Sequence, residues 1–389
     1  MKRIMFTQPR SKISHYLLEG TAVLLLLGLV VAISILHATK PPAQYEAQDA
    51  SLEETVQAEV LAVKQESSSE DETGLAQISQ LLELEILSGE HQGEQVEVTY
   101  NGLGPELRDI RFQPGERAMV MILTQPTGES HYGIADHLRW RPLGALTVLF
   151  ALVTVLVGRW QGVRAIGGLI LSILLVGGFI LPQILAGREP VLITVVGMSA
   201  LMAATLYLIQ GWNPISHTAL LALLFSLALT ALLAIFWTRS AHLTGFGSEE
   251  TLYLQSTGVQ LDMRGLLLAG IIIGAAGVLD DVILAQAVSI FELYRANPTF
   301  TRREIYRRGM KVGNAHLASM INTLVLAYTS SALPLLILFY LYPEPWYLTI
   351  NRELIAEELV HTLVGSLGLI LAVPLTTALA AWVSVLTEE

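Results

Sequence analysis

Two adjacent carboxylates, Asp280 and Asp281, lie inside an otherwise uncharged apolar run that covers residues 266–290. A carboxylate inside a lipid bilayer costs at least ~2.5–3.5 kcal/mol, so such residues usually face a protein interior or a cavity and serve a function. Two neighbouring acids in a low-dielectric environment also resist joint ionisation. The pair therefore predicts a site that binds and releases a proton or a small cation. The alternative is a structural role, in which each carboxyl group only hydrogen-bonds a neighbouring helix.

Helical spacing predicts different surroundings for the two carboxylates. Gly270, Gly274, Gly277 and Asp281 follow one another at intervals of four, three and four residues, which places them on one face of a helix. Glycines in this pattern allow a second helix to approach closely. We therefore expect Asp281 to point at a packed helix. Asp280 is turned away by about 100° and is expected to face a second neighbour or a cavity.

The next apolar run, residues 317–341, carries polar side chains at a similar expected depth. If this run is antiparallel to the first, the depth of Asp281 falls between Thr323 and Tyr328. His316 precedes the run at its inner end, where it could exchange protons or only cap the helix. The candidate pathway comprises Asp280, Asp281, Gln286, His316, Asn322, Thr323 and Tyr328. For the neutral polar residues, hydrogen bonding between packed helices is the competing interpretation.

The composition identifies the class of protein that must position these residues. Of the 389 residues, 52% are hydrophobic and 15% are charged, compared with about 25% charged residues in soluble domains. Apolar runs of membrane-spanning length cover residues 21–36, 142–157, 163–185, 191–209, 215–237, 266–290, 317–341 and 359–386. The sequence thus predicts a polytopic α-helical membrane protein with about eight transmembrane helices. The chain has no cysteine, which excludes disulfides and cysteine-ligated metals.

A soluble domain separates the first predicted helix from the other seven. We expect a cytoplasmic tail at 1–16 and a transmembrane helix at 17–37, for which a cleaved signal peptide is the less favoured alternative. Residues 38–141 hold 19 acidic and 7 basic residues. Alternating runs at 55–63, 81–87, 95–100 and 117–123 predict strands of a small OB-like barrel, with a flexible acidic loop at 66–72. A seven-helix membrane block at 142–389 follows, and includes a basic loop at 291–316.

The distribution of lysine and arginine predicts the orientation. With the N-terminus inside, twelve of these residues fall on the inner side and four in the short outer loops. Both termini are then cytoplasmic, the basic loop is cytoplasmic and the acidic β domain is extracytoplasmic. The predicted location is the cytoplasmic (plasma) membrane. An acidic domain argues against a nucleic-acid partner, so the expected partners are the lipid bilayer, a proton or small cation, and a protein.

Two classes of function fit these features. The leading hypothesis is an ion- or proton-coupled transporter or translocation component that uses Asp280 and Asp281. If a metal is involved, oxygen ligands favour a hard cation such as Mg²⁺, Mn²⁺ or Na⁺. The alternative is a membrane scaffold or accessory subunit that binds partners through the β domain and the basic loop. The sequence carries no nucleotide-binding loop, zinc-type His/Glu pair or nucleophile elbow, so we expect neither an enzyme nor a cofactor.

Several segments carry a resemblance to a known family. They are GVLDDV at 277–282 with the downstream Gln286, ELYRANP at 292–298, RRGMKVGNAHLASMINTL at 307–324 and LAYTSSALPLL at 326–336. These segments resemble the YibE/F-like family of multi-spanning membrane proteins. The resemblance implies an N-terminal span, an external β-rich domain and a membrane block, but it implies no mechanism.

A weaker likeness is to the membrane parts of SecD/SecF and the proton-driven RND pumps. In those proteins an intramembrane acidic residue also precedes a charged inner loop and a threonine-rich span. This chain departs from them by its two additional predicted spans before Asp280 and by its much smaller external domain. The likeness is therefore an analogy of plan only.

Overall fold

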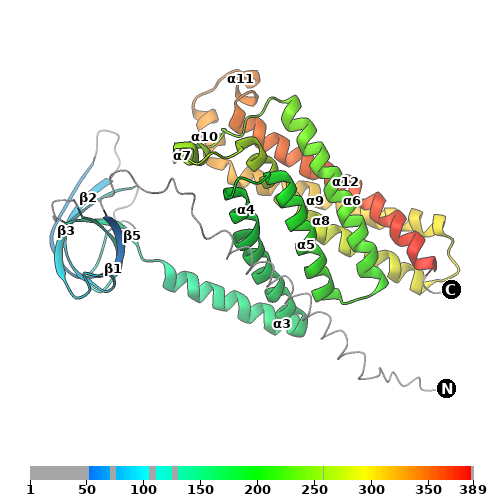
Figure 1. Cartoon of the computed structure of the whole chain (residues 1–389), viewed down its shortest axis with the longest axis horizontal. Coiled ribbons are helices and arrows are strands. Elements are labelled where there is room, and N and C mark those ends of the chain that lie inside the picture. The colour runs from blue at the N-terminus through cyan, green and yellow to red at the C-terminus, as the bar shows by residue number, and fades with distance from the viewer. Residues whose placement is uncertain (1–51, 71–75, 105–110, 125–129, 257, 387–389) are drawn as a thin grey trace. The chain divides into compact units, whose positions relative to one another are not determined.

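A computed structural model describes residues 52–70, 76–104, 111–124, 130–256 and 258–386 (Figure 1). The predicted cytoplasmic tail at 1–16 and the predicted transmembrane helix at 17–37 lie outside the described residues. The chain divides into two compact units, Gln44–Val157 and a unit that includes Gly158–Glu389. The first unit contains a sheet and the helix that begins at Trp140, and the described residues of the second unit form helices joined by loops.

The first unit is built around a curved five-stranded antiparallel sheet, a half-barrel, that precedes the first described helix (Figure 1). Its strands are β1 (Leu52–Glu70), β2 (Ala76–Ile86), β3 (Gln95–Gly104), β4 (Arg117–Thr124) and β5 (Ser130–His137), in the order β3-β2-β1-β4-β5. The four predicted strands correspond to β1 to β4. The alternation that predicted them is visible in β4, where every second residue from Ala118 to Ile122 is buried.

Strand β1 is the central strand of the sheet and is long enough to pair on both of its sides. Its first part pairs with β4, from Leu52 to Glu59, and its later part pairs with β2, from Ala58 to Glu70. The register with β2 shifts twice between Val60 and Gln65, and such irregularities bend a strand and increase its twist. Residues 66–70, which we expected to belong to a flexible acidic loop, instead continue β1 as paired strand.

Phe112 fills the space between the two edge strands of this sheet. Its ring makes an edge contact with Tyr100 of β3, with ring centroids 5.0 Å apart, and stacks on His137 of β5 at 3.8 Å. The buried Gln80 fixes the backbone of Phe112 in the manner of a strand partner. The Gln80 side-chain amide donates to the Phe112 carbonyl at 3.1 Å, and the Phe112 N–H donates to Gln80 Oε1 at 2.8 Å.

The remaining elements of the described part of the chain are helical, and they include five stretches that are long and apolar enough to cross a membrane. The helical elements are α3 (Trp140–Leu175), η1 (Val176–Ile180), α4 (Leu181–Leu185), α5 (Pro190–Gln210), α6 (Pro214–Ser240), α7 (Glu249–Ser256), α8 (Met263–Ala296), α9 (Arg302–Ser331), α10 (Leu333–Leu341), α11 (Trp346–Ile350) and α12 (Glu353–Leu386). Helices α9 and α10 meet at a bend of 68°, and the count of candidate spans rises to six if they form one span. The chain is therefore a multi-span membrane protein.

The predicted division between the spans at 142–157 and 163–185 agrees with a break inside α3. Two helices meet there at Arg159, whose φ of 49° and ψ of −126° are not helical. Beyond the break, α3 continues through η1 and α4 to Leu185. By contrast, the expected basic loop at 291–316 is mostly helix, because α8 continues to Ala296 and α9 begins at Arg302. Charged residues outside the apolar windows led us to end the first of these helices too early and to begin the second too late.

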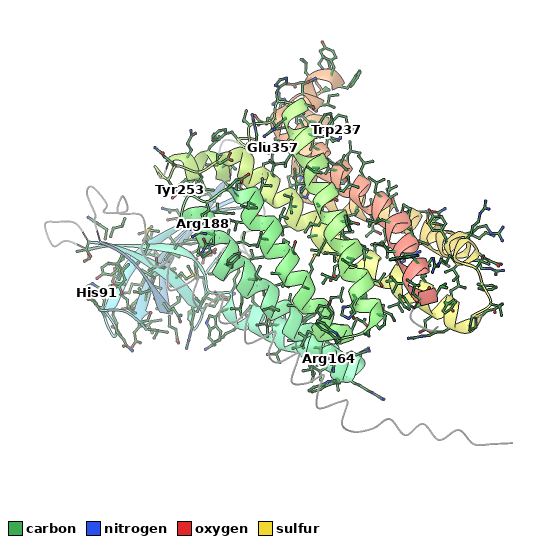
Figure 2. The ribbon with its side chains drawn as sticks, turned by 45° about the vertical axis from the view of Figure 1, so that its right-hand side comes forward. His91, Arg164, Arg188, Trp237, Tyr253 and Glu357 are labelled. Carbon is green, nitrogen blue, oxygen red and sulfur yellow. The ribbon has the colours of Figure 1, made fainter. Side chains whose placement is uncertain are left out.

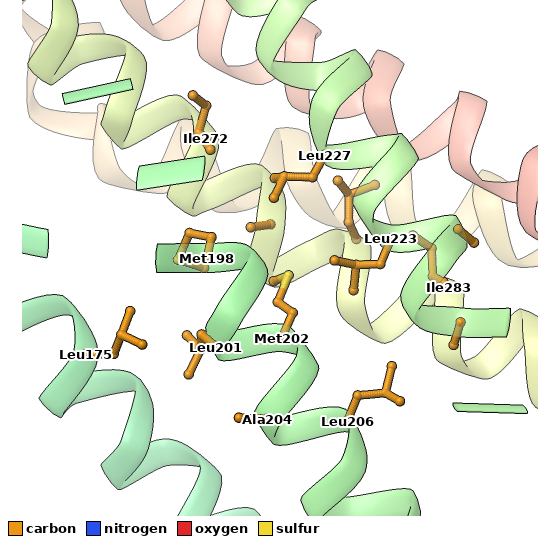
Figure 3. Close-up of a cluster of buried hydrophobic side chains, with 14 of the residues drawn as sticks. Leu175, Met198, Leu201, Met202, Ala204, Leu206, Leu223, Leu227, Ile272 and Ile283 are labelled. Carbon is orange, nitrogen blue, oxygen red and sulfur yellow. The ribbon is translucent and has the colours of Figure 1, made fainter. Parts of the chain in front are cut away.

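Helix α8 occupies the middle of the second unit and packs against α5, α6, α9 and α12. Figure 3 shows the main apolar cluster, to which α5 contributes Met198 and Met202 and α8 contributes Ile272 and Ile283. Leu223 and Leu227 of α6 belong to the same cluster and are almost fully buried. Because α8 is surrounded in this way, the residues along it are the ones best placed to line an intramembrane site.

Candidate functional site

The two aspartates of α8 have different surroundings. Asp280 is half-buried, and its Oδ1 atom is buried without a hydrogen-bond partner among the described residues. Asp281 lies on an exposed part of α8. We expected Asp281 to point at a packed helix, and the structure instead gives the more enclosed position to Asp280. Asp280 is therefore the carboxyl group whose surroundings call for a positively charged or hydrogen-bonding partner.

The glycines on the Asp281 face do not form the predicted close helix contact along their whole length. No atom lies within 4 Å of a Cβ built at Gly270 or at Gly277, so both positions face open space. A Cβ at Gly274 would lie 2.8 Å from His361 Nε2 and 3.4 Å from the Tyr328 hydroxyl. Of the three predicted packing glycines, Gly274 alone makes room for side chains of α9 and α12.

A cavity of about 360 Å³ adjoins Asp280 between α3, η1, α5 and α8. Its lining residues are Ala165, Gly168, Leu169, Ser172, Val176, Met198, Leu201, Met202, Thr205, Ile209, Ile273, Gly277 and Asp280. Asp280 is the one charged residue in this lining. This placement agrees with the expectation that Asp280 faces either a second neighbour or a cavity.

Gln286 lies one to two turns after the aspartates and joins three helices. Its side chain is 4% exposed, and its Nε2 donates to the Gly309 carbonyl of α9 at 3.0 Å and to Thr377 Oγ1 of α12 at 2.8 Å. A Cβ at Gly313 would lie 2.5 Å from Val373 Cγ1 of α12 and 3.1 Å from Gln286 Nε2. Gln286, which we predicted as a pathway residue, thus holds a tightly packed three-helix junction.

The polar residues of α9 divide between its two faces. The face that packs on α8 and α12 includes Leu317, Leu324 and Tyr328. His316, Asn322 and Thr323 lie on exposed parts of the helix, and the Thr323 hydroxyl donates to the Ser319 carbonyl of its own helix at 3.1 Å. The structure therefore brings Gln286 and Tyr328 to the interface with α12, but it does not gather His316, Asn322 and Thr323 around the aspartates.

Tyr328 meets a histidine that the sequence did not mark as a site residue. The Tyr328 hydroxyl lies 3.2 Å from His361 Nε2, and the two ring centroids are 4.6 Å apart. Glu358 lies nearly one turn before His361 on α12, and its Oε2 is buried without a hydrogen-bond partner among the described residues. His361 itself is half-buried. Its position three residues after Glu358 was the available signal for a polar cluster inside the bundle.

The described residues contain no group of three or more histidine, aspartate or glutamate side chains that could hold a metal ion. Within the described part of the chain, the chemistry that the site offers is therefore one carboxyl group beside an apolar cavity. A second polar cluster, formed by Tyr328, His361 and Glu358, lies at the packed interface of α9 and α12.

Comparison with known proteins supplies one match. The model of a family described as YibE/F-like protein matches residues 146–385, which include all of the helices from α5 to α11, nearly all of α12 and most of α3. The match also includes Asp280, Gln286 and the three-helix junction. No curated protein and no solved structure matches the chain.

Proposed function

We propose, from the premise that this chain belongs to the YibE/F-like family of membrane proteins, that it is an ion- or proton-coupled transporter or translocation component. Its coupling group would be the carboxyl of Asp280, with Asp281 as the neighbouring acid. The observation that carries this proposal is the buried, unpartnered Oδ1 of Asp280 beside a cavity within a helix bundle. An ionisable residue within a membrane span is costly, and such residues commonly mark ion pathways and proton relays.

The two aspartates would have separate roles in this mechanism. Asp280 would bind the coupling proton or cation, because its enclosed oxygen has no competing partner among the described residues. Asp281 is exposed one residue further along α8 and would influence ionisation of Asp280 through repulsion between like charges. Gln286 would keep α8 fixed to α9 and α12 while the coupling ion is exchanged.

We place eight spans in the whole chain, with both termini in the cytoplasm. The 46 residues from α3 to α4 would be roughly 69 Å long as one straight helix, about twice the ~30 Å core of a bilayer. The break at Arg159 divides them into two helices, so we assign them two spans. Arg164 and Arg188 lie at opposite ends of the helical unit in Figure 2. This arrangement supports an inner side at Arg164 and an outer side at Arg188, with the β domain outside the cell.

A scaffold or accessory subunit is the second candidate function. It is favoured by the row of exposed basic residues on the first half of α9. Arg302, Arg303, Arg307 and Lys311 are exposed, whereas Arg308 is engaged by Glu304 at 2.8 Å. Such a row could bind an acidic segment of a partner protein.

Charge-displacement recording on a solid-supported membrane separates the two candidates without knowledge of the transported substrate. Proteoliposomes that contain the full chain would receive concentration jumps of H⁺, Na⁺ and Mg²⁺. Coupling through Asp280 predicts a transient current for at least one of these cations in the wild type, its loss in Asp280→Asn, and its retention in altered form in Asp281→Asn. The absence of current in the wild type, or an unchanged current in Asp280→Asn, would refute the proposal.

A further inference from the structure

We propose that the cavity beside Asp280 binds an organic monocation with an apolar body, such as a protonated amine or a quaternary ammonium compound. This inference deepens the proposed function, because it names the class of substrate for the same site. It rests on the size of the cavity, on the chemistry of its lining, and on the Asp280 carboxyl group, whose Oδ1 has no hydrogen-bond partner among the described residues.

The charge of the lining favours a cation. Asp280 is the one charged residue among the lining side chains, and its Oδ1 has no hydrogen-bond partner among the described residues. The two hydroxyls of the lining cannot donate to it without giving up existing bonds. Ser172 Oγ donates to the Gly168 carbonyl at 2.9 Å, and Thr205 Oγ1 donates to the Leu201 carbonyl at 3.0 Å. The missing partner of the carboxylate must therefore come from outside the lining.

The remainder of the lining favours an apolar body on that cation. Leu169, Leu201 and Ile273 present aliphatic side chains to the cavity, and Met198 and Met202 add flexible thioethers that adapt to varied shapes. A volume of about 360 Å³ lies within the ~300–1,000 Å³ range of small-molecule sites. A bare Mg²⁺ or Na⁺ would exchange its water for a mostly hydrocarbon surface and one carboxylate, which is unfavourable.

Arg164 restricts where the positive group of the ligand can lie. It directly precedes Ala165, the first lining residue, and its guanidinium donates to the carbonyl of the lining residue Ile209 at 3.3 Å. A fixed positive charge therefore stands beside the cavity, just after the break in α3 and at the C-terminal end of α5, which is one end of the helix bundle in Figure 2. Repulsion from this charge would keep the cationic head of a ligand on the side of Asp280 that faces the rest of the cavity.

Two variants test the site with matched controls. Asp280→Asn removes the charge while it keeps the shape of the side chain, and Asp281→Asn makes the same change at the exposed neighbouring position. Gly277→Leu would fill the cavity from within, because Gly277 is a lining residue and no atom lies within 4 Å of its built Cβ. The first atom that the substitution adds therefore meets no neighbour. Gly270→Leu is its control, since Gly270 also faces open space but does not line the cavity.

The experiment is equilibrium binding of phenyltrimethylammonium to the purified full chain in detergent, with its neutral isostere tert-butylbenzene as competitor. We expect saturable binding to the wild type, at least tenfold weaker binding to Asp280→Asn and Gly277→Leu, near wild-type binding to the two controls, and no effective competition by tert-butylbenzene. Equal binding to Asp280→Asn, or equal competition by the neutral isostere, would overturn the inference. A thermal melt of each variant identifies any loss of binding that is caused by unfolding.

The binding result and the current described above fail independently. If a cation-dependent current needs Asp280 but phenyltrimethylammonium does not bind, the inference about ligand class is wrong and the coupling role stands. If phenyltrimethylammonium binds in a manner that depends on Asp280 but no current depends on Asp280, the coupling role is wrong and the binding site stands.

Discussion

Replacing Gly313 by alanine tests the three-helix junction around Gln286. The added Cβ would lie 2.5 Å from Val373 Cγ1, 3.1 Å from Gln286 Nε2 and 3.2 Å from Gln286 Oε1. Neither neighbour can give way easily. Val373 is 1% exposed and β-branched, so its rotamers are few, and the Gln286 amide is held by Gly309 and Thr377. The methyl group must therefore separate α9 from α12 or break a buried hydrogen bond.

Two opposing contributions determine how Gly313→Ala changes the free energy of unfolding. Overpacking a well-packed interior typically costs about 1–3 kcal/mol. Exchanging glycine for alanine within a helix stabilises the folded state by about 0.5–1 kcal/mol, because the unfolded chain has less conformational entropy to lose. Gly277→Ala is a matched control, since a Cβ there meets no atom within 4 Å and only the favourable term applies. The difference in unfolding free energy between the two variants thus isolates a steric term of about 1–3 kcal/mol.

The assay is equilibrium unfolding by SDS titration in mixed micelles, followed by far-ultraviolet circular dichroism and by tryptophan fluorescence. We expect Gly313→Ala to unfold at a lower SDS fraction than the wild type, and Gly277→Ala to unfold at the same or a higher fraction. If Gly313→Ala were as stable as Gly277→Ala, α9 would not be packed against α12 in the manner described. The proposal that Gln286 holds α8, α9 and α12 together would then be wrong.

Three further predictions concern the polar contacts that hold each unit together. Gln286→Met should lower the unfolding free energy by about 1–3 kcal/mol in the same SDS titration, because it removes both hydrogen bonds of the buried Gln286 amide, to the Gly309 carbonyl and to Thr377. Gln80→Met should cost at least as much in a thermal melt of the full chain, because it removes both bonds to the Phe112 backbone. The pKa of Asp136 is lowered, first by the Arg139 side chain and then by the His137 N–H. Asp136→Asn should therefore reduce the melting temperature above the ordinary carboxyl pKa of about 3.9, and its difference from the wild type should vanish as the pH falls through the lowered pKa.

The strands and the membrane character could be predicted because their signals are local. The alternation of apolar and polar residues along β1 to β4 indicates strands with one buried face. A run of about 20 apolar residues indicates a transmembrane span. The first half of α9 was missed because its charged residues resemble a loop between spans. Its helical character depends on contacts such as Ile305 with the end of α8, which are not visible in the local sequence.

The orientation of side chains on α8 was harder to predict. A helical wheel gives the angle between Asp280 and Asp281, but it does not say which of the four neighbouring helices covers which angle. The glycine rule was applied to Gly270 and Gly277, which face open space, whereas Gly309 and Gly313 provide the close contacts of α9. This second pair has the same four-residue spacing, but it lies between Arg308 and His316 in a segment that we had assigned to a loop.

The most direct test of coupling through Asp280 is the response of its carboxyl group to cations. Infrared difference spectra of the purified full chain would be recorded on changing pH and on adding Na⁺, Mg²⁺ or phenyltrimethylammonium. A coupling role for Asp280 predicts a carboxyl band that changes with pH or with one of these cations in the wild type and in Asp281→Asn, and that is missing in Asp280→Asn. Spectra of Asp280→Asn that contain every responsive carboxyl band of the wild type would contradict that role.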